Sequence, residues 1–301
     1  MATAYSQQYP LGTPSVSGNS LTVDLMLKEP TRINAYLSDL ALKNYFAERI
    51  FTNGGGVSGG ALVYSQLVAN DLFPTRAAQK VAPGAEFPEI TFDRPEPKTA
   101  QVEKLGGKYR VTDEARDRND LSSIQNESVK LGNDIQRQLH ARALSELEAS
   151  IAAVGSDLQI TGTSWLDATL LNISTSNKAA LPGADMAEIR KRADLKEFGT
   201  TYNLLIMNPQ EYANLTILTD NNPDGWLSAN GFSAVRSNQV TAGTMYAVQE
   251  GLVGQVRYEQ PLATVAYRDE GTESTWVKSS IRPVFAVTNP YNALKITGLA
   301  A

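Results

Sequence analysis

The sequence contains no cysteine and only one histidine, His140, among its 301 residues. Without cysteine the chain forms neither disulfides nor thiolate metal sites, and a single histidine is too few for a histidine-based metal centre within one chain. No run of 18 apolar residues is present, and the N-terminus lacks the basic and apolar regions of a signal peptide. We therefore expect neither a membrane span nor a bound metal or cofactor.

An excess of positive charge is also missing. The 27 Lys and Arg residues face 32 Asp and Glu residues, which gives a net charge of -5. A surface that wraps nucleic acid through its phosphates needs clustered Lys and Arg, so this balance argues against one. With 42% apolar and 20% charged residues, the chain is typical of a soluble globular protein of one large or two ordinary domains.

The first 23 residues contain no charged side chain and are rich in Ser, Thr, Gln, Gly and Pro. Such a composition predicts an extended or disordered arm. Apolar positions in residues 31–51 predict an amphipathic helix, which Thr31 would cap. The glycine-rich residues 53–60 then predict a flexible hinge, and residues 61–72 a short apolar strand or helix.

Residues 74–120 are rich in charge and read as a long extended hairpin. Eight Lys or Arg and eight Asp or Glu lie between Lys80 and Arg118. The segment has too few apolar residues to build its own core, yet residues 87–92 and 108–112 have strand character. We expect this hairpin to find its partners on another molecule, with five residues at the contact: Phe87, Ile90, Phe92, Arg94 and Lys98.

A single long helix is predicted after the hairpin. Its apolar residues recur at spacings of three, four or seven and line one face. They are Leu121, Ile124, Leu131, Ile135, Leu139, Ala143, Leu147, Ile151 and Val154. Asn119 or Asp120 would cap its start, and Gly155 would end it, giving a length on the order of 50 Å.

The C-terminal half mixes helices and strands. We expect helices over residues 184–198 and from Pro209, and strands over residues 202–207, 248–258, 263–267, 274–287 and 292–297. The pattern has neither a periodic βαβ winding nor an internal repeat, so it predicts an α+β fold.

None of the candidate catalytic groups forms a convincing site. The glycine run lacks the Lys-Ser/Thr and the helix N-terminus of a phosphate-binding loop. Asp113, Glu114 and Asp117 are interleaved with arginines that would keep them ionised, which makes them poor general acids. His140 is expected to be structural, and the three tryptophans, Trp165, Trp226 and Trp276, to anchor the core or an interface. We expect no enzyme.

The order of these parts resembles the major capsid protein of tailed bacteriophages, whose fold encapsulin shells share. Four segments carry the resemblance: VAPGAEFPEIT at residues 81–91, GKYRVTDEA at 107–115, LIMNPQEY at 205–212 and VTNPYNALKIT at 287–297. In that family they belong to the extended hairpin, to its junction with a spine helix, to the axial domain and to the closing strand of the peripheral domain. The chain lacks the long charged helical start that serves as a fused scaffold in some members.

The resemblance implies a division into an N-terminal arm and short helix (residues 1–60), an extended hairpin loop (61–118), a peripheral domain (119–160 and 260–301) and an axial domain (161–259). It implies a structural protein that self-assembles, as pentamers and hexamers, into an icosahedral shell around double-stranded DNA. The shell would form in the host bacterial cytoplasm with a portal and a scaffold or decoration protein. An encapsulin-like compartment remains an alternative, and a hydrolytic enzyme would need a carboxylate pair in a concave pocket.

Overall fold

The computed structural model describes residues 46–68, 78–90, 95–118, 121–165, 181–196 and 199–300, together with Leu27, Thr31, residues 33–35, Leu37, Pro74 and Arg76. The described strands form a four-stranded sheet in the order β1-β9-β10-β4, a five-stranded sheet in the order β5-β11-β8-β6-β7, and the two-stranded pair β2-β3. The predicted α+β class is therefore confirmed.

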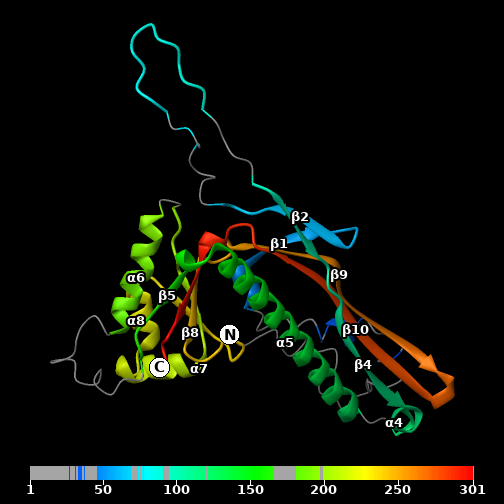
Figure 1. Cartoon of the computed structure of the whole chain (residues 1–301). Coiled ribbons are helices and arrows are strands. Elements are labelled where there is room, and N and C mark those ends of the chain that lie inside the picture. Colours follow the sequence, from blue (N-terminus) through cyan, green and yellow to red (C-terminus); the bar gives the residue numbers. More distant parts are fainter. Residues whose placement is uncertain are drawn as a thin grey trace, which may run out of the picture.

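The four-stranded sheet is built on a long hairpin. Its strands are β1 (Phe51–Gly56), β4 (Leu105–Thr112), β9 (Gly254–Asp269) and β10 (Ser274–Ala286). Strand β10 pairs antiparallel with both β9 and β4, whereas β1 runs parallel to the start of β9. The hairpin ends at a tight turn where Glu273 has a φ of 44°, and the short helix α4 (Asp113–Asp117) lies at the same end (Figure 1).

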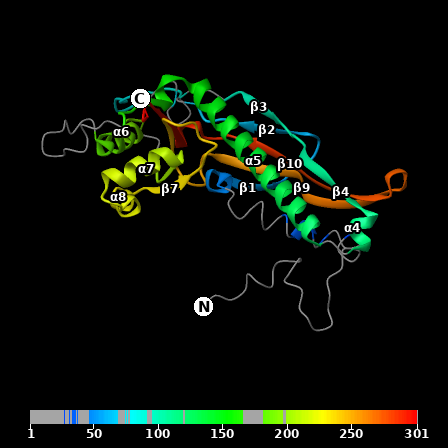
Figure 2. The same ribbon diagram turned by 90° about the horizontal axis from the view of Figure 1, so that it is seen from below.

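The predicted long helix is confirmed as α5 (Leu121–Val154), which has 34 residues. It crosses the face of the four-stranded sheet diagonally and reaches the five-stranded sheet at its C-terminal end (Figures 1 and 2). Gly107 of β4 permits close approach of the helix, because a Cβ there would lie 2.7 Å from Leu131 Cδ1. At the end of the helix, Gly155 has a φ of 96°, which favours the glycine found there.

One apolar cluster joins α5 to both sheets. Ile135, Leu139 and Leu147 are fully buried on α5, in contact with a cluster that includes Phe285 of β10 and Val248 of β8 (Thr244–Val248). Each such side chain stabilises the folded state by about 1.5–3 kcal/mol relative to its exposed state. The short helix α3 (Ala47–Ile50) joins the same cluster.

The five-stranded sheet carries a second apolar cluster between its strands and three helices. Its elements are β5 (Gln159–Thr161), α6 (Pro182–Leu195), β6 (Leu204–Met207), α7 (Pro209–Leu218), α8 (Pro223–Ala229), β7 (Ser233–Arg236), β8 and β11 (Ala293–Thr297). As predicted, α7 begins at Pro209, and Asn208 caps it: the Asn208 side chain accepts a hydrogen bond of 2.9 Å from the Gln210 backbone N–H. The buried Asp185 accepts one of 2.8 Å from the Trp165 indole N–H.

Two predictions for the N-terminal part are wrong. The helix predicted over residues 31–51 does not continue to its end, because Phe51 begins β1, and the glycine run at residues 54–56 lies in that strand rather than in a hinge. Glycine suits this run because Gly55 has a φ of 84°, a left-handed conformation that favours glycine. The predicted arm at residues 1–23 lies outside the described residues.

The extent of the hairpin also differs from the prediction. The paired strands are β2 (Ala61–Ser65) and β3 (Pro97–Gln101), whereas residues 105–112 belong to the four-stranded sheet as β4. Residues 87–90 are irregular and not a strand. Pro83 and Pro88 explain this, because proline removes a backbone donor and disfavours regular pairing. The predicted caps Asn119 and Asp120 and residues 91–92 lie outside the described residues.

The predicted last strand is present as β11, which pairs with β8 and β5 in the five-stranded sheet. Its assignment to a peripheral domain stays a prediction. Pro290 ends the extended run after β10, and a short turn at Pro290–Asn292 redirects the chain. Three of the five residues of β11 are buried, which a central strand requires.

His140 lies in the buried face of α5, with its ring 4.2 Å from that of Phe46. Burial lowers the pKa of this imidazole from its usual 6.5 to about 4. The neutral ring is therefore the form that the folded chain holds at pH 7, as a structural histidine requires. Within the described part of the chain, no helix combines the length and apolarity needed to cross a bilayer.

We expect Ile135→Asp to remove soluble folded protein. The side chain is 2% exposed at the centre of the shared cluster, so a carboxylate there would be buried without a partner and cost several kcal/mol. Ser145→Asp on an exposed position of α5 is the matched control and should melt as the parent chain does. Normal yield and melting of Ile135→Asp would mean that this face is not buried.

We also expect the stability of the protein to fall as the pH drops from 6.5 towards 4. Because the folded-state pKa of His140 lies below the unfolded value, the unfolded chain binds more protons in this window, at a cost on the order of 2–3 kcal/mol. The sole imidazole gives a single set of NMR signals, which should not titrate between pH 8 and 5. A midpoint near 6.5 would contradict burial, and His140→Gln should reduce the loss of stability.

Candidate assembly surfaces

In the connection between β2 and β3, residues 78–90 lie far from the body of the molecule (Figure 1). We call residues 66–96 the extended loop. Its tip exposes Phe87, which is 83% accessible and the most exposed of the large apolar side chains described, and Ile90, which is 40% accessible. An exposed aromatic ring on a projecting segment is typical of a contact with another molecule.

The base of the extended loop is held firmly. Strands β2 and β3 form five cross-strand pairs, from Ala61–Gln101 to Ser65–Pro97. Leu62 of β2 packs with Val284 and Ala286 of β10, which joins the pair to the four-stranded sheet. The Leu67 N–H donates to the Thr288 carbonyl at 2.8 Å. The direction in which the loop leaves the body is therefore fixed by the fold.

The five residues predicted at the contact do not all lie at the tip. Phe87 and Ile90 are exposed there, as the prediction required. Lys98 lies in β3 instead, where its ammonium group donates a hydrogen bond to the Gln66 side chain and thus ties the two ends of the loop together. Phe92 and Arg94 lie outside the described residues.

The carboxylates near α4 form ion pairs. Arg268 of β9 donates to both oxygens of Asp113, at 2.9 and 2.8 Å, and this bond is the main reason why the pKa of Asp113 is lowered. Arg116 lies 3.6 Å from the same carboxylate. A carboxylate held ionised in this way cannot act as a general acid, so the group ties β9 to α4.

The tryptophans serve as anchors. Trp165 is 2% exposed in the second apolar cluster, and Trp226 packs against that cluster. Trp276 of β10 receives the Lys108 ammonium group 4.2 Å from its ring centroid. Among the described residues no group of three or more Asp, Glu or His is arranged to hold a metal ion.

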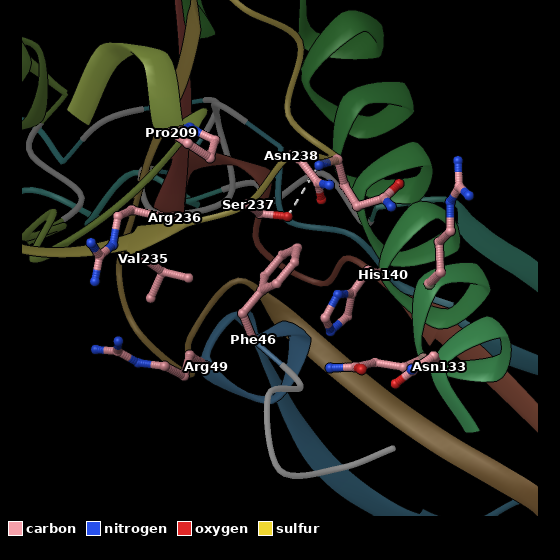
Figure 3. A pocket seen from close by; sticks show the side chains of 12 residues that line it. Phe46, Arg49, Asn133, His140, Pro209, Val235, Arg236, Ser237 and Asn238 are labelled. Atoms are coloured by element: carbon pink, nitrogen blue, oxygen red, sulfur yellow. Dashed lines mark hydrogen bonds between the residues drawn. The ribbon is translucent and has the colours of Figure 1, made fainter. Parts of the chain in front are cut away.

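A cleft of about 910 Å³ that the sequence did not reveal lies between α5, α3 and the end of β7. Figure 3 shows Arg49 and Arg236 on one side and His140 and Asn133 of α5 on the other, with Phe46 between them. Arg137 of α5 also lines the cleft. Its residues come from four separate segments of the chain, so no local pattern could have signalled it.

Comparisons with known proteins identify the family and similar folds. A family model described as phage capsid protein matches residues 95–296. The capsid structure of cyanophage P-SCSP1u has 13% identity and a TM-score of 0.58, and the alignment covers 83% of this chain and 88% of that one. A structure from Mycobacterium phage Bobi has 14% identity and a TM-score of 0.57, with 86% and 89% covered.

The virus-like particle from Pyrococcus furiosus has 11% identity and a TM-score of 0.54, with 88% of this chain and 98% of that chain covered. No curated protein matches the sequence. At these identities the solved structures establish a common fold, whereas the family model, which spans more than half of the 301 residues, establishes the family. This chain therefore belongs to the phage capsid protein family and is a structural protein of a capsid shell.

Proposed function

We propose that this protein is the major capsid protein of a tailed bacteriophage. Copies of it would form pentamers and hexamers of an icosahedral shell around double-stranded DNA, in the cytoplasm of the bacterial host. A portal and a scaffold or decoration protein would take part in assembly. The observation that carries the proposal is the extended loop, which is fixed at its base and ends in an exposed aromatic ring.

Shell assembly of this kind needs many weak contacts rather than one strong contact. A contact worth about 4 kcal/mol alone corresponds to millimolar affinity. When one subunit touches several neighbours, later contacts become intramolecular and the avidity rises steeply. Burying Phe87 against a neighbour would contribute about 1.5–3 kcal/mol, which is the size such a contact requires.

The charge of the chain suits a container for DNA. A net charge of -5 avoids tight binding of the packaged phosphates. We propose that the protein encloses its genome without sequence-specific contacts and without catalysis. The carboxylate group nearest to a catalytic pattern, at Asp113, is neutralised by arginines, which supports this view.

An encapsulin-like compartment is the second candidate. The likeness to the Pyrococcus furiosus virus-like particle covers 98% of that chain and favours it specifically. Electron microscopy of the purified protein, with mass spectrometry of what the particles contain, separates the two. Particles that package DNA when phage genes are present support the capsid, whereas particles that retain a cargo enzyme support the compartment.

We expect Phe87→Ala to give folded subunits that fail to close into shells. The substitution removes the most exposed apolar contact of the extended loop and leaves the core untouched, so melting should not change. Glu89→Ala in the same loop is the matched control, because a single exposed ion pair is worth only about 0–1 kcal/mol. Sedimentation velocity measures the shell fraction.

Shells from Phe87→Ala alongside none from Glu89→Ala would reverse the argument and make electrostatic attraction the controlling contact. Shells from both variants would mean that the tip of the loop is not an assembly contact.

A further inference from the structure

The cleft beside α5 gathers positive charge from three separate elements. Arg49 comes from α3, Arg137 from α5 and Arg236 from the end of β7, and all three line the same concavity. Among the described residues that line it, none is Asp or Glu. A concave site lined by charges of one sign focuses the electrostatic field and concentrates ligands of opposite charge. This cleft therefore has the field of an anion-binding site in a protein of net negative charge.

Two of the three arginines are not neutralised. Arg49 is held by Glu250, with its Nε 2.5 Å from the carboxylate, and donates to the Ser233 hydroxyl at 3.2 Å. The guanidinium carbon of Arg236 lies 4.5 Å from the centroid of the Tyr212 ring. This stacking orients the guanidinium group and does not neutralise its positive charge. Within the part of the chain that the structure describes, neither Arg137 nor Arg236 has a carboxylate within ion-pair distance. Two guanidinium groups thus stay available for a ligand.

The rest of the lining fits a peptide. Pro209, which is exposed, and Val235, which is half-buried, offer apolar surface, while carboxamide side chains can donate to and accept from a peptide backbone. The carboxamides are those of Asn133, Gln136, Asn238 and Gln239. A guanidinium group binds a carboxylate through two parallel hydrogen bonds, so glutamate or aspartate side chains match the two available arginines.

Other polyanions fit less well. A duplex presents its phosphates on a convex surface, which cannot enter a cleft of about 910 Å³ between a helix and a sheet. A small inorganic anion would leave the apolar lining unused. The N-terminal 23 residues carry no charge, and the segment from Lys80 to Arg118 carries as many positive as negative charges, so neither part of a second copy supplies a strongly acidic segment.

We propose that this cleft binds an acidic segment of a separate protein, with its carboxylates on Arg137 and Arg236 and an apolar side chain against Pro209 and Val235. This is a contact beyond those between shell subunits proposed above. It does not involve the extended loop, so Phe87→Ala should leave it unchanged.

Fluorescence anisotropy on the full chain as unassembled subunits tests the proposal at about 0.15 M salt. The labelled ligand is an octapeptide of four glutamates alternating with four leucines, and its partner replaces the glutamates by glutamine. We expect the acidic peptide to bind with micromolar affinity and the neutral peptide at least tenfold more weakly. Arg137→Glu should weaken acidic-peptide binding at least tenfold, because it inverts one of the two available charges.

Lys130→Glu is the matched control, since Lys130 is exposed on the same helix and does not line the cleft. It should bind as the parent does. Arg236→Gln provides a second test variant, and thermal melting checks the fold of each. Three results would overturn the proposal: no binding of the acidic peptide, equal weakening by Lys130→Glu, or tighter binding of a peptide copying residues 80–95, which would assign the cleft to a second copy.

Discussion

The packing of one face of α5 against two sheets at once is the constraint on which the rest of the molecule depends. Ile135, Leu139 and Leu147 contact strands from both the four-stranded and the five-stranded sheet, so the two sheets share a core. Glu148 strengthens the junction, because it accepts a bond of 2.7 Å from Lys295 of β11. That Lys295 bond and a second one from Tyr246 lower the pKa of Glu148 despite its partial burial. The sheets therefore keep a fixed relation to each other.

The extended loop and the β9–β10 hairpin both project from this shared core. The extended loop leaves from β2 and β3, which are anchored to β10 through Leu62 and Val284. The β9–β10 hairpin is tied to α4 through Arg268 and Asp113. Paired strands connect the β9–β10 hairpin and the base of the extended loop to the rest of the molecule. Strand pairing therefore fixes where each projection leaves the body.

Sequence reasoning succeeded where periodicity is long and local, and it failed where partners are distant in the chain. The 34-residue helix follows from the spacing of its apolar residues, and the start of α7 at Pro209 follows from that one proline. The sheet to which β11 belongs depends on β5 and β8, more than 40 residues away, and no local feature encodes that choice. The cleft at Arg137 was missed for the same reason. The position of Lys98 in β3, at the base of the extended loop, depends on strand pairing that its charge does not reveal.

The composition of the extended loop disfavours pairing with other strands. A long exposed strand edge is a template for aggregation, and natural edges are blunted with proline, charge or irregular backbone. Here Pro83 and Pro88 remove backbone donors, Gly84 adopts a φ of 82°, and Glu86 and Glu89 flank the exposed ring of Phe87. The apolar pattern of residues 87–92 therefore predicts their backbone structure poorly. Side chains with strand propensity lie here on a backbone that does not favour strand pairing.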